Sequence, residues 1–174
     1  MYTDWILKAN ENQTQKTLEE HVVELLSRQK MTVATAESCT GGLIAATLVN
    51  VPGASDVLNE GYITYSNEAK MRLVGVSRET LAQYGAVSAQ TAKEMAEGAA
   101  KAAKADAALS ATGIAGPGGG TEEKPTGLVY IGCFVNGKTV VKECIFDGNR
   151  MENRQNTAET ALEMLAQALE NPEK

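Results

Sequence analysis

A chain of 174 residues, 43% of them hydrophobic, fits one domain with its own apolar core, since single domains usually hold roughly 100–200 residues. Its formal net charge of −6 argues against nucleic-acid binding, which needs a clustered positive surface. No apolar run approaches the roughly 20 residues that span a membrane, and no signal-peptide pattern opens the chain. We therefore expect a cytoplasmic protein with no membrane partner.

Helices and strands alternate in the first part of the chain. Residues 1–15 have no clear period, and we expect a tail that docks through Trp5. Thr17 and Glu20 form a capping box that predicts a helix ending near Gln29. The hydrophobic pattern then predicts strands over 31–36 and 61–65, and helices over 41–50, 67–73, 77–85 and 88–104. The last of these is rich in alanine, and its small-residue face suits close packing against a sheet or a second subunit.

The second part of the chain predicts a strand, a hairpin and a closing helix. The strand covers 107–111 and leads into a glycine-rich loop at 113–120. Two further strands, 127–135 and 138–146, turn at an Asn-Gly pair, and a helix over 152–170 follows. This order predicts a three-layer α/β/α sandwich with a mixed β-sheet, in a single domain over 16–174.

The three cysteines and the single histidine argue against a metal site, a disulfide and histidine-based catalysis. Cys39, Cys133 and Cys144 do not have metal-ligand spacing, and the predicted hairpin register does not set the last two thiols opposite each other. His21, the single histidine, lies in an amphipathic helix and is expected on its surface. Hydrolytic chemistry in this chain is therefore expected to proceed without histidine and without a metal.

Ser38 is a candidate nucleophile because it follows a strand and precedes a helix. Free N–H groups at a helix N-terminus can stabilise a developing oxyanion, and the two glycines that follow let a substrate approach the backbone. The alternative is that Ser38 only caps the helix, which is the common role of a serine in this position. Cys39 is a rival nucleophile, but no histidine lies near it in the sequence to form a thiolate pair.

Lys70 is a candidate base, in the first turn of a predicted helix that follows a strand. It could accept a proton only if its pKa fell from about 10.4 to roughly 7–8. The positive end of its helix acts in that direction. The alternative is an ordinary solvated lysine.

The glycine-rich loop at 113–120 is a candidate anion site, because its backbone N–H groups can form a concave surface for an anion. It is neither a Walker A loop nor a dinucleotide fingerprint, and a flexible turn is the alternative. Thr112 and Thr121 offer hydroxyls at its edges. Arg150 and Arg154 open the last helix and suit phosphate or carboxylate contacts, although exposed helix arginines are common.

Several of these segments occur together in the order of one family. The chain resembles the C-terminal domain of competence-damage-inducible protein A, and closely its stand-alone bacterial members that act as nicotinamide mononucleotide deamidases. The resemblance covers roughly residues 16–170, and several separate motifs in one order are a specific signal. The motifs are residues 36–42 (AESCTGG), 65–70 (YSNEAK), 113–119 (GIAGPGG), 123–127 (EKPTG) and 148–150 (GNR).

The resemblance implies hydrolysis of the nicotinamide amide to nicotinate mononucleotide and ammonia, in pyridine nucleotide recycling. It implies a serine–lysine hydrolase without metal or cofactor, with Ser38 as nucleophile and Lys70 as its base. It also implies a homodimer and a small nucleotide as substrate. The matching motifs add six expected substrate contacts, which are Tyr65, Thr112, Gly113, Arg150, Thr40 and Gly41.

The resulting hypothesis is covalent catalysis. Neutral Lys70 takes the proton of Ser38 as its Oγ attacks the carboxamide, and backbone N–H groups after Ser38 or in the glycine loop hold the oxyanion. Arg150 and the glycine loop are the candidates for the 5′-phosphate, and the pyridinium ring is expected over Tyr65. Two alternatives remain: a catalytically silent nucleotide-binding paralogue, and an amidohydrolase for another small amide.

Overall fold

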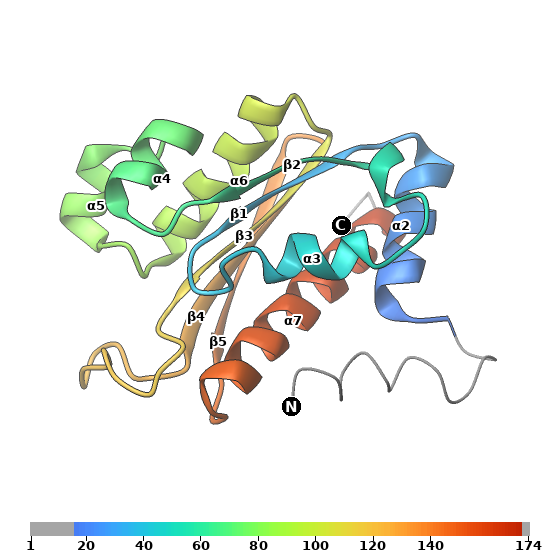
Figure 1. The fold of residues 1–174 in the computed structure, drawn as a ribbon. Coiled ribbons are helices and arrows are strands. Elements are labelled where there is room, and N and C mark those ends of the chain that lie inside the picture. Colours follow the sequence, from blue (N-terminus) through green and yellow to red (C-terminus); the bar gives the residue numbers. More distant parts are fainter. Residues whose placement is uncertain (1–15, 172–174) are drawn as a thin grey trace.

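The computed structural model describes residues 16–171, which form a five-stranded mixed sheet covered by helices on both faces (Figure 1). The strand order is β2-β1-β3-β4-β5. Strands β1, β2 and β3 run parallel, whereas β4 is antiparallel to both β3 and β5. The predicted α/β/α sandwich with a mixed sheet is confirmed. The strands are β1 (Val33–Glu37), β2 (Leu58–Ile63), β3 (Ala107–Gly113), β4 (Leu128–Val135) and β5 (Lys138–Ile145).

The helices form two layers. Helices α2 (Leu18–Gln29), α3 (Leu43–Val49) and α7 (Arg150–Glu170) share one apolar core with the sheet. On the opposite face α6 (Ala89–Ala103) packs on the strands, and α4 (Asn67–Val74) and α5 (Arg78–Tyr84) pack against α6. A short 3₁₀ turn, η2 (Ala54–Asp56), precedes β2. No helix in the described part of the chain is long and apolar enough to cross a membrane.

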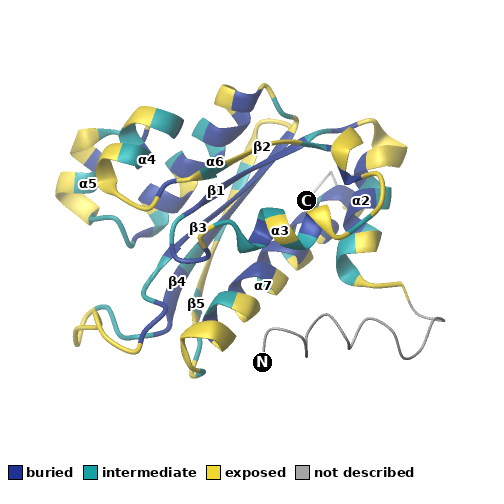
Figure 2. Ribbon diagram, viewed as in Figure 1, coloured by how far each residue is buried: buried dark blue, intermediate teal, exposed yellow. Residues whose placement is uncertain are grey.

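The interior strand β1, between β2 and β3, is buried along its whole length, as Figure 2 shows. Alternate side chains of a strand point to opposite faces. Val33 accordingly lies in the core on the side of α3 and α7, and Ala34 and Ala36 lie in the core on the side of α6. By the same alternation Glu37 lies on the α3 side. A carboxylate thus ends an otherwise buried strand of small and apolar residues.

The α6 layer packs closely because its contacting residues are small. Alanines of α6 are fully buried against the sheet, and Gly98 lies against the end of α4. A Cβ atom at Gly98 would lie 1.7 Å from the carbonyl oxygen of Val74. The small-residue face of α6 is therefore used against the sheet and α4. The expected homodimer remains a prediction.

Local signals place several helices well. The Thr17–Glu20 capping box is present and α2 ends at Gln29, as predicted. Serines cap α4, α5 and α6, at Ser66, Ser77 and Ser88. The predicted tail, residues 1–15, lies outside the described residues, and so does the predicted role of Trp5.

Several boundaries differ from the prediction, among them those of β1 and β3, and three of the differences have a clear physical reason. Strand β2 lies at Leu58–Ile63 rather than 61–65, because its start is set by parallel pairing with β1 and most of its residues are exposed. Helix α3 begins later than predicted, at Leu43, because Gly41 and Gly42 have left-handed φ values of 59° and 97°. Helix α7 begins earlier, at Arg150, because Asn149 caps it.

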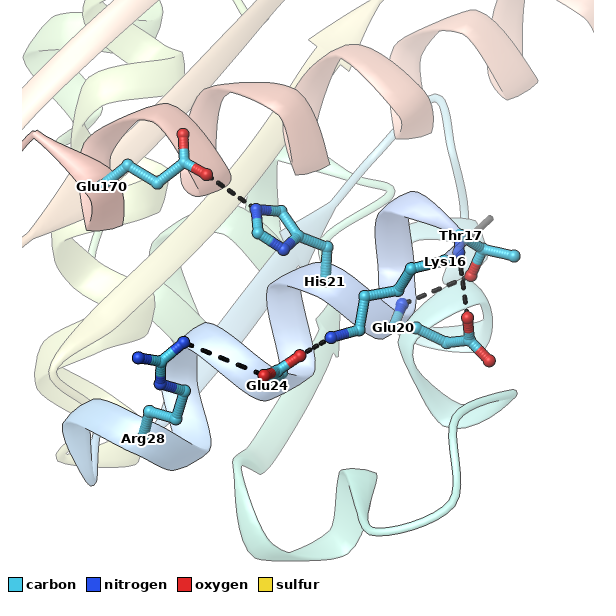
Figure 3. Close-up of polar contacts among 7 residues, drawn as sticks. All are labelled: Lys16, Thr17, Glu20, His21, Glu24, Arg28 and Glu170. Carbon is cyan, nitrogen blue, oxygen red and sulfur yellow. Dashed lines mark hydrogen bonds and ion pairs between the residues drawn. The ribbon is translucent and has the colours of Figure 1, made fainter. Parts of the chain in front are cut away.

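The histidine and cysteines have the structural roles expected of them. His21 is partly exposed on α2 and its Nε2 lies 2.7 Å from Glu170 of α7, in the polar cluster of Figure 3. The three cysteines are free, and the hairpin register sets Cys133 opposite Val140 and Cys144 opposite Val129. Within residues 16–171, no group of three His, Cys, Asp or Glu side chains is placed to hold a metal ion.

Candidate active site

A small pocket lies where the parallel strands end. Strands β1, β2 and β3 finish at the same edge of the sheet, which is where α/β folds hold their ligands. The pocket has a volume of about 240 Å³. It brings together six of the eight predicted site residues, while Thr40 and Gly41 are not among those that line it. The six are Ser38, Tyr65, Lys70, Thr112, Gly113 and Arg150.

Ser38 and Lys70 face each other in this pocket. Lys70 Nζ lies 3.2 Å from Ser38 Oγ and donates to the carbonyl oxygen of Thr64 at 2.8 Å. The lysine sits in α4, whose start is fixed by the Ser66 cap, so its side chain reaches back under the end of β2. These contacts put an amine within hydrogen-bonding distance of a serine hydroxyl.

Lys70 is buried without a partner of opposite charge. Its side chain is only 1% exposed, and no carboxylate forms an ion pair with it in the described residues. Burial penalises the charged ammonium and lowers the pKa of Lys70 below its ordinary value. The dominant cause of the shift is desolvation, and not the positive end of the helix that the sequence suggests. A neutral amine at this position can act as a base.

Cys39, the rival nucleophile, has the opposite electrostatic environment. Burial, reinforced by the negative charge of Glu37, raises the pKa of the Cys39 thiol to about 11. A thiol with that pKa is almost entirely protonated at neutral pH, and the thiolate is the nucleophilic form. The preference for Ser38 over Cys39 therefore has a physical reason beyond the missing histidine.

The turn that carries Ser38 differs from the prediction in one respect. The Ser38 amide donates to Ala111 of β3, and the side chain of Glu37 accepts from the amides of Gly42, Ile44 and Ala45. The N-terminal amides of α3 were expected to be free for an oxyanion, but they are already bonded to Glu37. No role for Glu37 is predicted from the sequence, although an acidic residue inside a buried strand signals that its carboxylate has partners.

Other amides remain as candidates for the oxyanion. Leu43 donates to the carbonyl of Thr40, so it too is occupied. Within residues 16–171, the amides of Cys39 and Thr40 donate to no oxygen atom, and both lie at the Cys39 sulfur, where their N–H groups partly offset the rise in the thiol pKa. These are the amides directly after Ser38, one of the two groups considered from the sequence.

Arg150 and Tyr65 form the mouth of the pocket. The Arg150 guanidinium donates to the carbonyl of Gly116 at 2.9 Å and to the Tyr65 hydroxyl at 3.3 Å. Tyr65 is 63% exposed, so its ring is available to a ligand. Thr112 donates its hydroxyl proton to the carbonyl of Ala86 at 2.7 Å, and its oxygen can still accept.

Thr40 and Gly41 follow Ser38 in the turn but do not line the small pocket. Thr40 is fully buried, its hydroxyl has no partner in the described part of the chain, and its carbonyl accepts from Arg154 at 2.6 Å. The carbonyl of Cys39 accepts from Arg154 Nε at 3.1 Å. Arg154 thus binds the backbone of the Ser38 turn, whereas the sequence suggested a phosphate or carboxylate contact for it.

A second, larger pocket of about 670 Å³ adjoins the first and shares Ala115 and Arg150 with it. No Asp or Glu lines either pocket, although the chain as a whole carries a formal net charge of −6. The basic side chains that line them are those of Arg150 and Arg154, which carry positive charge, and the buried amine of Lys70. The combined cavity therefore suits an anionic ligand.

Lys124, in the EKPTG motif, connects the glycine-rich loop to the wall of the small pocket. Lys124 donates to the carbonyls of Tyr84 at 2.9 Å and Val87 at 2.7 Å. Val87 lines the small pocket. The EKPTG motif thus fastens the loop after β3 to the segment between α5 and α6.

Comparison with known proteins gives one consistent family. The sequence profile described as "CinA C-terminal domain" matches residues 15–169. A "Putative competence-damage inducible protein" of Clostridioides difficile is 51% identical over 170 residues, which is 98% of this chain and 40% of that protein. A "CinA-like protein" of Kosmotoga olearia is 56% identical over 155 residues, or 89% of this chain and 38% of that protein. The chain thus spans about two fifths of the length of these curated relatives.

Solved structures agree. The competence/damage inducible protein CihA of Agrobacterium tumefaciens matches with a TM-score of 0.84 and 44% identity, over 91% of this chain and 99% of that one. A CinA superfamily protein of Klebsiella pneumoniae 700603 matches with a TM-score of 0.85 and 31% identity, over 90% and 99% of the two chains.

Proposed function

The chain belongs to the CinA C-terminal domain family, and we propose that it is a serine amidohydrolase that converts nicotinamide mononucleotide and water to nicotinate mononucleotide and ammonia. The observation that carries this proposal is the buried Lys70 amine 3.2 Å from the Ser38 hydroxyl, at the end of the parallel strands. The family is known for this deamidation, and the basic lining of the pocket agrees with a phosphorylated substrate.

In the first step Lys70, as a neutral amine, accepts the Ser38 proton while Oγ attacks the carboxamide carbon. A C–O bond forms, and the carbonyl π electrons move to the oxygen. The tetrahedral intermediate then collapses as the C–N bond breaks. The ammonium form of Lys70 gives its proton to the leaving nitrogen, so ammonia departs and the amine is neutral again.

In the second step water hydrolyses the acyl-enzyme. Lys70 takes a proton from the water as its oxygen attacks the ester carbon, and it returns that proton to Ser38 Oγ as the C–O bond breaks. Nicotinate mononucleotide leaves with its new carboxylate. The cycle consumes one water and releases one ammonia, and it needs no redox partner.

The oxyanion of both steps needs N–H donors, and the amides of Cys39 and Thr40 are the candidates nearest to Ser38. One such donor contributes roughly 3–4 kcal/mol to transition-state stabilisation. Arg150 and the glycine loop would receive the 5′-phosphate in the larger pocket. The positively charged pyridinium would lie over the exposed ring of Tyr65, where a cation–π contact stabilises it.

The decisive experiment measures ammonia and nicotinate mononucleotide released by the purified protein from nicotinamide mononucleotide. The panel includes the riboside and unrelated small amides. Release from the mononucleotide above all others supports the proposal. Binding of the mononucleotide without ammonia release would identify a silent nucleotide-binding protein, and preferential release from another amide would identify a different amidohydrolase.

A further inference from the structure

The backbone turn that carries Ser38 is held from two sides by charged side chains that take no part in the proposed bond-making and proton-transfer steps. We propose that Glu37 and Arg154 are positioning residues, which hold this turn so that Ser38 Oγ stays directed at Lys70 Nζ. The inference rests on the proposed function only in taking Ser38 as the nucleophile. It does not depend on which amide is the substrate.

Glu37 holds the N–H side of the turn. Its carboxylate is fully buried and accepts from the amides of Gly42 at 3.0 Å, Ile44 at 3.0 Å and Ala45 at 2.9 Å. No cation within residues 16–171 forms an ion pair with it. Three N–H donors at a helix start replace the water that a carboxylate loses on burial. Glu37 thereby fixes the start of α3 relative to the end of β1.

Arg154 holds the C=O side of the same turn. From α7 its Nε donates to the carbonyl of Cys39 at 3.1 Å, and a terminal nitrogen donates to the carbonyl of Thr40 at 2.6 Å. Because the C=O and N–H of a trans peptide point in opposite directions, these bonds also orient the Thr40 and Gly41 amides. The planar guanidinium fork supplies both donors in fixed geometry, which a lysine cannot do.

The two contacts are complementary, since an anion takes the donors of the turn and a cation takes its acceptors. Between them lie Gly41 and Gly42, both with left-handed φ, which accept many backbone conformations when nothing holds them. A shift of about 1 Å in a reacting atom can lower a rate roughly 10²-fold. Loss of either contact is therefore expected to slow attack by Ser38 rather than to weaken substrate binding.

The test uses Glu37→Gln, Arg154→Ala and Arg154→Lys in the full chain, with Glu94→Gln as matched control. Glu94 also accepts a backbone amide at a helix start, that of Ser77, but lies outside both pockets. Two rates are measured on folded protein well below each melting temperature. One is ammonia release from the mononucleotide and its riboside, and the other is labelling of Ser38 by a small uncharged fluorophosphonate.

We expect Glu37→Gln and Arg154→Ala to lower kcat and the labelling rate at least tenfold, with KM changed less than threefold. The fall in kcat should be equal for mononucleotide and riboside, and Arg154→Lys should recover only part of it. Glu94→Gln should keep wild-type rates. Labelling at the wild-type rate in both Glu37→Gln and Arg154→Ala would overturn the inference. A rise in KM for Arg154→Ala that is confined to the phosphorylated substrate would overturn it as well.

The same design separates this inference from the proposed function. Wild-type protein that is labelled at Ser38 but releases no ammonia from the mononucleotide would overturn the substrate assignment, and the labelling rates would still test the positioning. Wild-type protein that is not labelled at all would overturn both, because Ser38 would then not be an activated nucleophile.

Discussion

Helices α3 and α4 follow neighbouring parallel strands, yet their first turns are stabilised differently. Helix α4 is capped by its own Ser66 hydroxyl, and it carries a buried lysine without an ionic partner. Helix α3 begins with two left-handed glycines, and its amides are taken by a carboxylate from the preceding strand. In the first region an amine is buried where its charged form is disfavoured. In the second region the Glu37 carboxylate accepts three backbone hydrogen bonds, which hold the start of α3 in place.

The contrast separates two requirements of a serine–lysine pair. The nucleophile needs a fixed position, and strong hydrogen bonds around it supply that. The base needs an altered proton affinity, and an unfavourable environment supplies that at a cost in stability. Substitutions on the two sides of the pair should accordingly differ in what they do to activity and to folding.

The largest effect is expected for Ser38→Ala, which removes the nucleophile and leaves both helix starts intact. Ammonia release should fall by roughly 10³-fold or more, since removal of a covalent nucleophile leaves only binding and electrostatic effects. Calorimetry of nicotinamide mononucleotide binding should show an affinity close to that of the wild type. Near-normal ammonia release would reassign the nucleophile to Cys39 or to a water.

Substitution of Lys70 should follow closely. Both Lys70→Ala and Lys70→Arg should lower the acylation rate by roughly 10²–10⁴-fold, the usual contribution of a positioned base. Arginine keeps the positive charge but does not release a proton, so it should not rescue the rate. The pH profile of kcat/KM should show an ionisation below the ordinary lysine value in the wild type alone. Substantial activity of Lys70→Arg would mean that charge suffices and that the base lies elsewhere.

A smaller effect is expected at the pocket mouth. Arg150→Ala should weaken binding of the mononucleotide by roughly 1.5–3 kcal/mol, the contribution of a hydrogen bond to a charged group. The loss for the phosphate-free riboside should be smaller, which titration calorimetry of both ligands can compare. Equal losses for the two ligands would remove Arg150 from phosphate recognition.

The smallest effect concerns stability, and its sign sharpens the contrast between the two helices. Burial lowers the pKa of Lys70 in the folded protein, so the unfolded chain binds more protons between that lowered value and about 10.4. Stability should therefore rise with pH through this window. Lys70→Met should melt roughly 2–4 °C higher at neutral pH, the shift that about 1 kcal/mol produces in a domain of this size.

The gain from Lys70→Met should shrink as the pH approaches 10, where the unfolded lysine also becomes neutral. Thermal melts of wild type and variant at several pH values test this. Glu37→Gln should melt lower than the wild type at neutral pH, because one of its amide hydrogens would face the N–H groups of α3. A lower melting temperature for Lys70→Met would show that its contacts outweigh its desolvation.

Much of the fold follows from local signals in the sequence. Helix α2 is set by a capping box, and the hairpin turns at an Asn-Gly pair, where the positive φ values of 47° and 87° suit those residues. Strand β2 was misplaced because its residues alternate weakly and its register depends on β1. Pairing between strands is a property of two segments, and one segment read alone does not contain it.

The site divides in the same way. Ser38 and Lys70 were found because each lies in a motif next to a strand end. The contacts of Arg154 with Cys39 and Thr40 join residues 115 and 114 positions apart in the sequence. No local sequence pattern predicts such contacts. The partners of Glu37 could not be predicted, because they are backbone amides, which any residue type supplies; only its place in a buried strand indicates that the carboxylate needs partners.

The close approach of α6 to α4 links the position of Lys70 to a residue of α6. Gly98 touches the carbonyl of Val74, and Lys70 lies one turn earlier on the same helix. A methyl group at Gly98 would push against the end of α4, at a position that lines neither pocket of the candidate site. The spacing of the serine–lysine pair can thus be tuned by protein engineers, or drift during evolution, through a residue that never meets the substrate.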